Sequence, residues 1–210
     1  MTKINKLIEK YLDKKQEDDS SKHLPLLDNE FYASSVGGCP RLIYYSKVFP
    51  DRKKDPKSLK VFVLGNLVHD FLQKEVLSGE SEVPLVIETK GVKIKGRLDQ
   101  VDDNFIYEIK SVSTLRFVKE QPQKHHVLQL MLYLKAFKRE KGKIVYVEKN
   151  TFDIIEHEIV FDEKIYDEAV EGFVSVFQSM SKNALPDKTS EEWACKHCLF
   201  KKECDGEVLK

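Results

Sequence analysis

Two neighbouring segments of alternating polarity constrain the fold of this chain most strongly. In residues 91–101, apolar and charged side chains alternate, and Asp99 lies on the charged side. In residues 105–112, Glu108 and Lys110 are two positions apart and therefore share one face of an extended strand. The intervening Asp102-Asp103-Asn104 is typical of a hairpin turn. The sequence therefore predicts two antiparallel strands that present two carboxylates and an amine together.

The turn also predicts the register of this hairpin. A two-residue turn at Asp103-Asn104 places Asp99 opposite Glu108, and Cβ atoms of opposed residues lie about 4.5–5.5 Å apart. Two carboxylates that close repel each other unless a cation lies between them. Ile106 and Val112 share the face of Glu108, so that face is partly covered, and buried charges must be paired or bind metal. A solvated surface could carry the same residues, but the apolar crowding favours a site for a divalent metal ion.

Composition narrows the class of protein. A chain of 210 residues, 41% of them hydrophobic, fits one well-packed soluble domain with a short appendage. No segment approaches the roughly 18 apolar residues of a membrane span, and the first residues are too polar for a secretory signal. We therefore expect a cytoplasmic protein with no membrane partner. The 35 basic and 35 acidic residues balance, so no global field attracts nucleic acid.

The order of elements predicts an α/β fold with a mixed central β-sheet flanked by helices. Residues 1–30 form an N-terminal helix over 3–12 and a polar linker, Asp13–His23, and residues 31–210 form the main domain. Further helices are predicted from Pro40 through Tyr45, over 60–77 with a buried stripe of Leu64, Leu67, Val68, Phe71 and Leu72, over 123–141 and over 163–182. Strands are predicted near 83–89, 91–101, 105–113, 143–149 and 152–161.

The four cysteines predict one metal site shared by the two ends of the chain. Cys195, Cys198 and Cys204 form the pattern C-x₂-C-x₅-C, and Cys39 lies near the other end. A cytosolic setting argues against disulfides, and the C-x₂-C spacing suits thiolate ligation of a metal. Four cysteines satisfy either a zinc site or an iron–sulfur cluster, and their spacing does not choose between them. Unrelated free thiols are the remaining alternative.

Three further polar residues are candidate site residues. Gln129 and Tyr133 are four positions apart on an unusually apolar helix, so they are neighbours that need partners when buried. His69 lies at the edge of the helix stripe, one turn after Gly65, which leaves space for another chain or a ligand. A packed or surface histidine is the alternative for His69. His125 and His126 are expected to be surface residues at a helix start.

These motifs together resemble a known family. Gly-Arg-Leu-Asp99, Glu108-Ile109-Lys110 and Gln129-x₃-Tyr133 resemble the motifs of RecB-like nucleases of the PD-(D/E)xK superfamily. The cysteine frame, Cys39 with C-x₂-C-x₅-C, is similar to that of the iron–sulfur branch, which includes the CRISPR-associated Cas-four exonucleases and AddB-type nuclease domains. The resemblance covers about residues 31–205. Leu98-Asp99 stands where the family name has Pro-Asp, a variation common in the RecB branch.

The resemblance implies a restriction-endonuclease-like core and assigns a role to each matching residue. His69, Asp99, Glu108 and the main-chain carbonyl of Ile109 would hold Mn²⁺ or Mg²⁺, and Lys110 would orient the attacking water. Gln129 and Tyr133 would support the lysine and contact DNA. The four cysteines, Cys39, Cys195, Cys198 and Cys204, would bind a [4Fe–4S] cluster, with residues 186–210 completing that site.

The function implied is metal-dependent exonuclease cleavage of single-stranded DNA, 5′ to 3′, in CRISPR spacer acquisition. A metal held by carboxylates suits this reaction because it activates water and neutralises the phosphate. The implied partners are single-stranded DNA and CRISPR adaptation proteins, and a homo-oligomer stays open. Two alternatives also stay open: a non-catalytic DNA-binding or assembly subunit with a nuclease fold, and an AddB-like repair nuclease with a structural zinc or iron–sulfur site.

Overall fold

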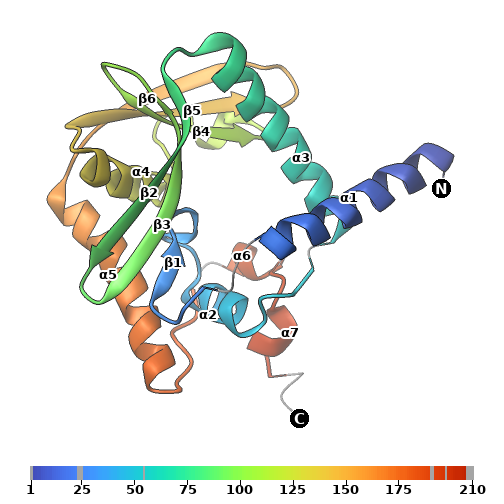
Figure 1. Cartoon of the computed structure of the whole chain (residues 1–210), viewed down its shortest axis with the longest axis vertical. Coiled ribbons are helices and arrows are strands. Elements are labelled where there is room, and N and C mark those ends of the chain that lie inside the picture. Colours follow the sequence, from blue (N-terminus) through green and yellow to red (C-terminus); the bar gives the residue numbers. More distant parts are fainter. Residues whose placement is uncertain (1, 23–25, 54, 190–191, 197, 207–210) are drawn as a thin grey trace.

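A computed structural model gives the fold of residues 2–22, 26–53, 55–189, 192–196 and 198–206 (Figure 1). The helices are α1 (Lys3–Lys22), α2 (Pro40–Val48), α3 (Pro56–Phe71), α4 (Lys124–Phe137), α5 (Glu163–Ser181), α6 (Glu192–Lys196) and α7 (Lys201–Cys204). The strands are β1 (Glu30–Tyr32), β2 (Glu80–Thr89), β3 (Val92–Val101), β4 (Ile106–Val112), β5 (Lys141–Glu148) and β6 (Ile154–Val160). A π-helical turn, Leu72–Val76, continues α3, and short 3₁₀ turns occupy Ala33–Ser35 and Leu115–Phe117.

The strands form one mixed sheet in the order β1-β3-β4-β5-β6, and β2 pairs with β3 as well. The pairs β1–β3 and β4–β5 are parallel, whereas β2–β3, β3–β4 and β5–β6 are antiparallel. The predicted α/β class with a mixed sheet flanked by helices is therefore confirmed. Among the described residues, no helix is long and apolar enough to cross a membrane.

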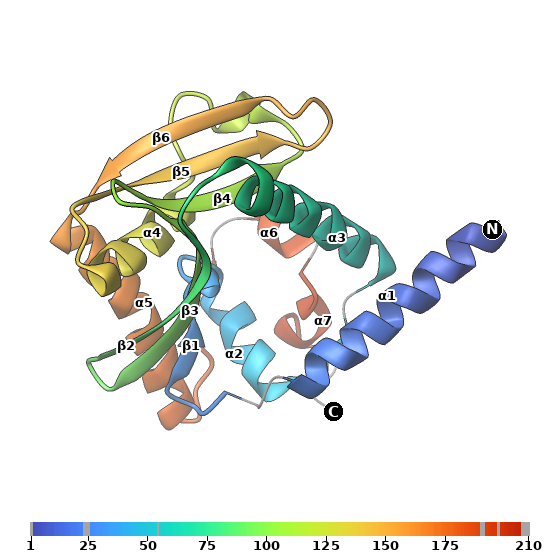
Figure 2. The ribbon, with the colours of Figure 1, turned by 45° about the horizontal axis from the view of Figure 1, so that its top comes forward.

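The hairpin of β3 and β4 opens soon after its turn. Pairing is confined to Gln100 with Tyr107 and Val101 with Ile106, which is the predicted register. Beyond these pairs the strands diverge, and β3 pairs instead with β1 at its other end, over 93–95. Figure 2 shows the β2–β3 ribbon curving away from β4, β5 and β6. The prediction that Asp99 pairs directly with Glu108 was therefore wrong, because the strands have separated at that point.

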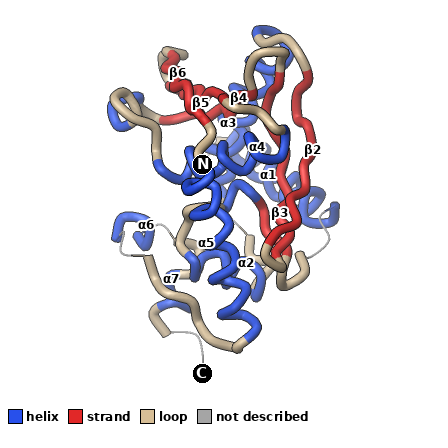
Figure 3. Tube along the Cα trace, turned by 90° about the vertical axis from the view of Figure 1, so that its left-hand side faces the viewer, coloured by secondary structure: helices blue, strands red, loops and turns tan. Residues whose placement is uncertain are grey.

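Helices cover both faces of the sheet. The helices α4 and α5 lie against one face (Figure 3). A large core lies there, where α4 buries every residue from 128 to 134 and α5 buries Phe173 and Val176. A smaller core on the opposite face joins Val68 and Leu72 to residues of β4 and β5. Glu108 and Lys110 alternate with Ile109, which belongs to the smaller core, so their side chains lie on the α4 face.

Several helix ends differ from the prediction: α3 begins at Pro56 rather than at residue 60, and α2 continues past Tyr45 to Val48. The predicted linker Asp13–Lys22 is helical, because residues 3–22 contain strong helix formers and no glycine or proline; His23 lies outside the described residues. The helix predicted to Lys141 ends at Phe137, since Lys138 takes a left-handed conformation and ends α4.

The predicted buried stripe of α3 was correct in part. Val68 and Leu72 are buried, but the side chains of Leu64, Leu67 and Phe71 are about half exposed. The sheet offers α3 a narrow contact, the smaller core of β4 and β5, so only one edge of the helix is covered. The hydrophobic pattern of α3 does not reveal which edge that is.

Candidate functional site

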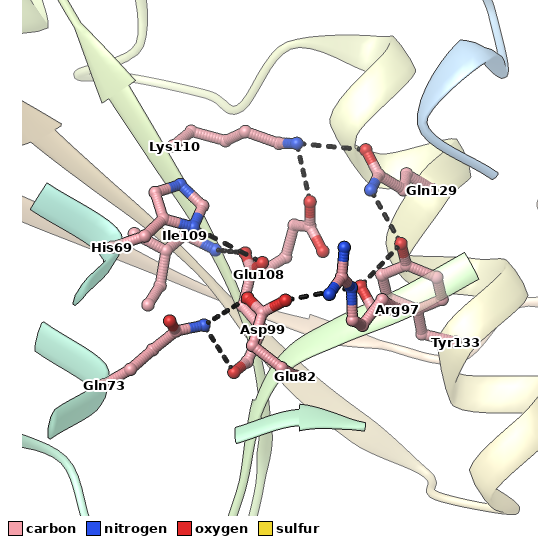
Figure 4. A network of polar contacts seen from close by, with 10 residues as sticks. All are labelled: His69, Gln73, Glu82, Arg97, Asp99, Glu108, Ile109, Lys110, Gln129 and Tyr133. Carbon is pink, nitrogen blue, oxygen red and sulfur yellow. Dashed lines mark hydrogen bonds and ion pairs between the residues drawn. The ribbon is translucent and has the colours of Figure 1, made fainter. Parts of the chain in front are cut away.

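Asp99 fills the gap that opens between β3 and β4. Its Oδ2 atom accepts a hydrogen bond of 2.7 Å from the main-chain N–H of Ile109, where a regular ladder would place a backbone carbonyl. Its Oδ1 atom lies 3.4 Å from Nδ1 of His69 (Figure 4). The side chain thus joins β3, β4 and α3, and its carboxylate is held by the fold rather than by solvent.

The buried Glu108 and the partly buried Lys110 form an ion pair beside it. The Lys110 ammonium lies 2.6 Å from Oε1 of Glu108, whose side chain is 2% exposed. The other oxygen, Oε2, is buried and has no hydrogen-bond partner among the described residues. A buried carboxylate oxygen without a partner is costly, and a bound cation satisfies it.

Gln129 and Tyr133 of α4 hold the lysine from the other side. Lys110 donates to Oε1 of Gln129 at 3.0 Å, and Nε2 of Gln129 donates to the Tyr133 hydroxyl at 2.9 Å. The hydroxyl donates in turn to the main-chain oxygen of Arg97 at 3.3 Å. Gly96 permits this arrangement, because a Cβ atom there would lie 3.0 Å from the tyrosine ring. The predicted partners of both polar residues are therefore found within the site.

His69 reaches the site from the opposite face of the sheet. Gly65, one turn earlier on α3, brings the helix close to β4, where a Cβ atom would meet Oγ of Ser111 at 3.2 Å. The space expected for a ligand beside Gly65 thus receives a neighbouring strand. His126, which was expected on the surface, is partly buried: its Nδ1 lies 2.8 Å from the Tyr146 hydroxyl, and burial lowers its pKa well below the ordinary value.

The protonation of the site follows from burial and close charges. Burial raises the pKa of Glu108 to about 7, Lys110 opposes this shift, and Asp99 adds to it. Burial disfavours the charged forms of Lys110 and His69, but their pKa values are raised overall, by Glu108 for the lysine and chiefly by Asp99 for the histidine. The ionised form of Glu108 is therefore costly in this buried position, and added positive charge relieves that cost.

The donor set suits a hard divalent cation. The imidazole of His69, the carboxylates of Asp99 and Glu108 and the carbonyl of Ile109 offer nitrogen and oxygen ligands of the kind that Mg²⁺ and Mn²⁺ accept. Among the described residues, no group of three or more histidine, cysteine, aspartate or glutamate side chains already has the arrangement that holds a metal ion. The partnerless oxygen of Glu108 nevertheless fits a cation at this position.

The cysteines lie in a second region, at the junction of α2, α6 and α7. Burial raises the pKa of the Cys198 thiol, and the nearby Cys39, Cys204 and Cys195 thiols raise it further. The fold thus brings the thiols from both chain ends within electrostatic range of one another. Nη1 of Arg41 lies 3.6 Å from Sγ of Cys204.

Aromatic packing docks the C-terminal segment onto α2. Phe200 is 2% exposed and packs against the rings of Tyr45 and Phe49, with ring centroids 5.9 and 6.1 Å away. The Tyr45 hydroxyl donates to the main-chain oxygen of Glu203 at 3.2 Å, and Arg52 pairs with its carboxylate. Cys39 precedes α2 directly, so this docking brings Cys204 towards it.

Gln73 and Glu82 belong to the polar network around Asp99, but the sequence analysis did not name them as site residues. Gln73 donates to the main-chain oxygen of Asp99 at 2.7 Å and to Oε1 of Glu82 at 3.0 Å, and Glu82 also pairs with Arg97. Gln73 lies four positions after His69, a helical spacing that could have indicated it. No local signal indicates Glu82, because its position depends on the pairing of β2 with β3.

Comparison with known proteins identifies the family of this chain. The sequence pattern described as the PD-(D/E)XK nuclease superfamily matches residues 75–205, which include the strands β3 and β4 and the helix α4. The chain is also similar to the CRISPR-associated exonuclease Cas4 of Saccharolobus solfataricus, with 27% identity over 212 residues, 96% of this chain and 100% of that protein. The predicted resemblance to nucleases of the PD-(D/E)xK superfamily is thereby confirmed.

Solved structures agree. The crystal structure of SSO0001 matches with a TM-score of 0.69 at 27% identity, covering 95% of this chain and 96% of that one. The Laribacter hongkongensis alkaline exonuclease LHK-Exo, in complex with dAMP, shares the fold at a TM-score of 0.52 and 11% identity, covering 74% and 89% of the two chains. The matched pattern spans more than half of the sequence and contains Asp99, Glu108 and Lys110. This chain belongs to the PD-(D/E)XK nuclease superfamily.

Proposed function

We propose that this protein is a metal-dependent DNA exonuclease that degrades single-stranded DNA from the 5′ end. The observation that carries the proposal is the buried set Asp99, Glu108 and Lys110, with an unsatisfied carboxylate oxygen, inside the region that matches a nuclease superfamily. The similarity to an exonuclease over 96% of the chain supports the same activity.

His69, Asp99, Glu108 and the carbonyl of Ile109 would hold the metal, Mn²⁺ or Mg²⁺. When bound, such a metal lowers the pKa of water and polarises a phosphate. Lys110 remains protonated, is held by Gln129, and donates a hydrogen bond to the attacking water or to a phosphate oxygen. Tyr133, which is 2% exposed, keeps Gln129 oriented towards the lysine from within the core.

We assign Cys39, Cys195, Cys198 and Cys204 to a [4Fe–4S] cluster with a structural role. The electrostatic interaction of Cys198 with the other three thiols supports a cofactor that all four share. The choice of iron over zinc comes from the similarity to the iron–sulfur nucleases. In this proposal residues 31–210 form the nuclease domain, the C-terminal segment completes the cluster site, and residues 1–30 form an appendage.

The proposed biological role is the trimming of DNA during CRISPR spacer acquisition. It rests on the similarity to a CRISPR-associated exonuclease. CRISPR adaptation proteins are the proposed partners, and assembly with further copies of the chain is compatible with the role.

Anaerobically purified protein tests the proposal. We expect about four irons per chain, visible absorbance from the cluster, and Mn²⁺-dependent loss of nucleotides from the 5′ end of labelled single strands. Replacing Asp99, Glu108 or Lys110 by alanine should lower the rate by ~10²–10³-fold or more. The matched control is Glu158→Gln, which should keep full activity. Glu158 is an exposed carboxylate on β6 that pairs with Lys141 of β5.

Each rival has its own outcome. Full activity in all three alanine variants would remove the catalytic assignment. DNA binding without metal-stimulated cleavage would identify a non-catalytic DNA-binding subunit instead. A colourless protein that contains zinc and still cleaves DNA would favour the zinc-stapled nuclease, and it would overturn the iron–sulfur assignment alone.

A further inference from the structure

Glu82 has an unusual backbone conformation directly beside the proposed metal site. The pairs Ser81–Gln100 and Val83–Leu98 flank it, so Glu82 stands opposite Asp99 on the neighbouring strand. Its φ angle is +57°, in the left-handed region that few residues other than glycine adopt. Such strain costs about 1–3 kcal/mol and persists where surrounding contacts impose it. The contacts of the Glu82 carboxylate therefore need an explanation.

Those contacts hold one arginine in place. Oε1 of Glu82 accepts from Gln73 at 3.0 Å, and Gln73, itself 7% exposed, also bonds the main chain of Asp99. Oε2 lies 2.9 Å from Nε of Arg97. Gln73 thus connects the main chain at Asp99 to the Glu82 carboxylate, and that carboxylate pairs with the guanidinium of Arg97 (Figure 4).

A stabilising role does not account for this arrangement. The side chains of Arg97 and Glu82 are 63% and 44% exposed, and exposed ion pairs contribute about 0–1 kcal/mol. That contribution is no larger than the backbone strain at Glu82. The arrangement is therefore better explained by the position in which it holds the arginine.

The side chain of Arg97 lies on the same face of β3 as Asp99, a proposed metal ligand. Arg97 lies two residues before Asp99, so the two side chains share a face of β3, and their Cα atoms are about 7 Å apart along the strand. Its Nε atom is engaged with Glu82, while its two outer nitrogens have no hydrogen-bond partner among the described residues. Its own carbonyl is bonded by Tyr133, which fixes the backbone at this point. The free edge of the guanidinium matches two oxygens of a phosphate group.

We propose that Arg97 is a phosphate-binding residue, which grips the DNA backbone phosphate next to the scissile one while Glu82 holds its Nε. The inference deepens the proposed nuclease function and rests on it. Arg97 makes no direct contact with Glu108 or Lys110 in the network, so its role is to bind and position the strand. Removing it should weaken DNA binding at one linkage without altering the centre itself.

The test is the affinity of a fluorescein-labelled single strand, measured by anisotropy in EDTA so that binding is observed without cleavage. Arg97→Ala should weaken binding about 10- to 100-fold, and the slope of log K against log [salt] should fall by about 0.7. Arg97→Lys should recover part of the affinity, because a point charge lacks the paired contact. Lys95→Ala is the matched control: Lys95 shares the strand and face and is paired with Glu30 at 2.8 Å.

Replacing one phosphate of the DNA strand by an uncharged linkage identifies the phosphate that Arg97 binds. One methylphosphonate, placed at each of the first 5′ linkages in turn, should weaken wild-type binding most at one position, and that loss should vanish in Arg97→Ala. Equal affinity and salt slope for Arg97→Ala, Lys95→Ala and wild type would overturn the inference. If wild-type protein fails to cleave DNA but Arg97→Ala still weakens binding, the nuclease proposal fails and phosphate binding by Arg97 stands.

Discussion

The proposed nuclease centre and the cysteine region are held in place in different ways. The centre is built on adjacent strands and on α4, and its anchors lie inside the continuous core: Tyr133 is 2% exposed and Gln129 is 5% exposed. The cysteine region is held by Phe200, Tyr45 and the pair of Arg52 with Glu203, none of which belongs to either core of the sheet.

The difference lies in what each region requires to form. The carboxylates and the lysine come from strands that must pair for the domain to fold at all. The cysteines come from the two sides of a contact that a few side chains make, and a bound metal would add to that contact. We therefore expect the centre to respond to changes in the core and the cysteine region to respond locally.

The largest effect contrasts two buried phenylalanines. Phe173 stacks on Phe31 in the main core with centroids 5.0 Å apart, and Phe200 packs against α2. Replacing either by alanine removes a fully buried ring, at about 3–5 kcal/mol. Phe173→Ala should lower the free energy of global unfolding, whereas Phe200→Ala should release residues 198–206 and reduce the iron content. Hydrogen exchange with mass spectrometry separates the two effects. Identical exchange patterns in both variants would mean that the regions form one unit.

A prediction of intermediate size concerns Gln129 and Tyr133, the residues that hold Lys110. Gln129→Ala removes the acceptor that holds Lys110 and the donor to Tyr133, so the cleavage rate should fall about 10- to 100-fold. Tyr133→Phe keeps the packing and should have a smaller effect. Cluster absorbance should not change in either variant. Gln178→Ala, at an exposed position on α5, is the control, and a comparable loss of activity there would contradict the assignment.

The smallest effect concerns the turn that sets the register of the centre. Asp102 accepts from the main-chain N–H groups of Asn104 and Phe105 and from the Tyr107 hydroxyl, at 2.7, 2.8 and 2.6 Å. Asp102→Ala should lower the free energy of unfolding by about 1–2 kcal/mol, measured by urea denaturation. Asp103→Ala, its neighbour in the turn, should change it by less than ~0.5 kcal/mol.

The contribution of Asp102 to the free energy of unfolding should depend on pH. Burial opposes ionisation of Asp102, but the bonds from Tyr107, Phe105 and Asn104 lower its pKa overall. The folded protein thus binds this proton less readily than the unfolded chain does. The stabilisation is fully present above the ordinary carboxyl pKa of about 4 and is lost as the pH falls through the lower folded value. A difference between wild type and Asp102→Ala that persists at low pH would contradict this account.

Particular residues show where sequence reasoning reached the structure and where it did not. The alternation around Asp99 and the turn at Asp103-Asn104 predicted the strands and the register, because both depend on local backbone geometry. The divergence of β3 from β4 was not predicted, since β1 and the packing of Tyr133 over Gly96 come from distant parts of the chain. The half-exposed Leu64 and Leu67 were missed for the same reason: a helical pattern does not reveal how wide its neighbour is.

The sequence by itself determined which groups this protein can use: the two carboxylates and a lysine at strand spacing, the glutamine and tyrosine one helical turn apart, and four cysteines at ligand spacing. Tertiary structure alone decided how they meet. It placed Asp99 in the gap between strands, brought His69 across the sheet, and set Glu82 against Arg97. Local patterns follow from the periodicity of helix and strand, whereas these contacts depend on where separate elements pack.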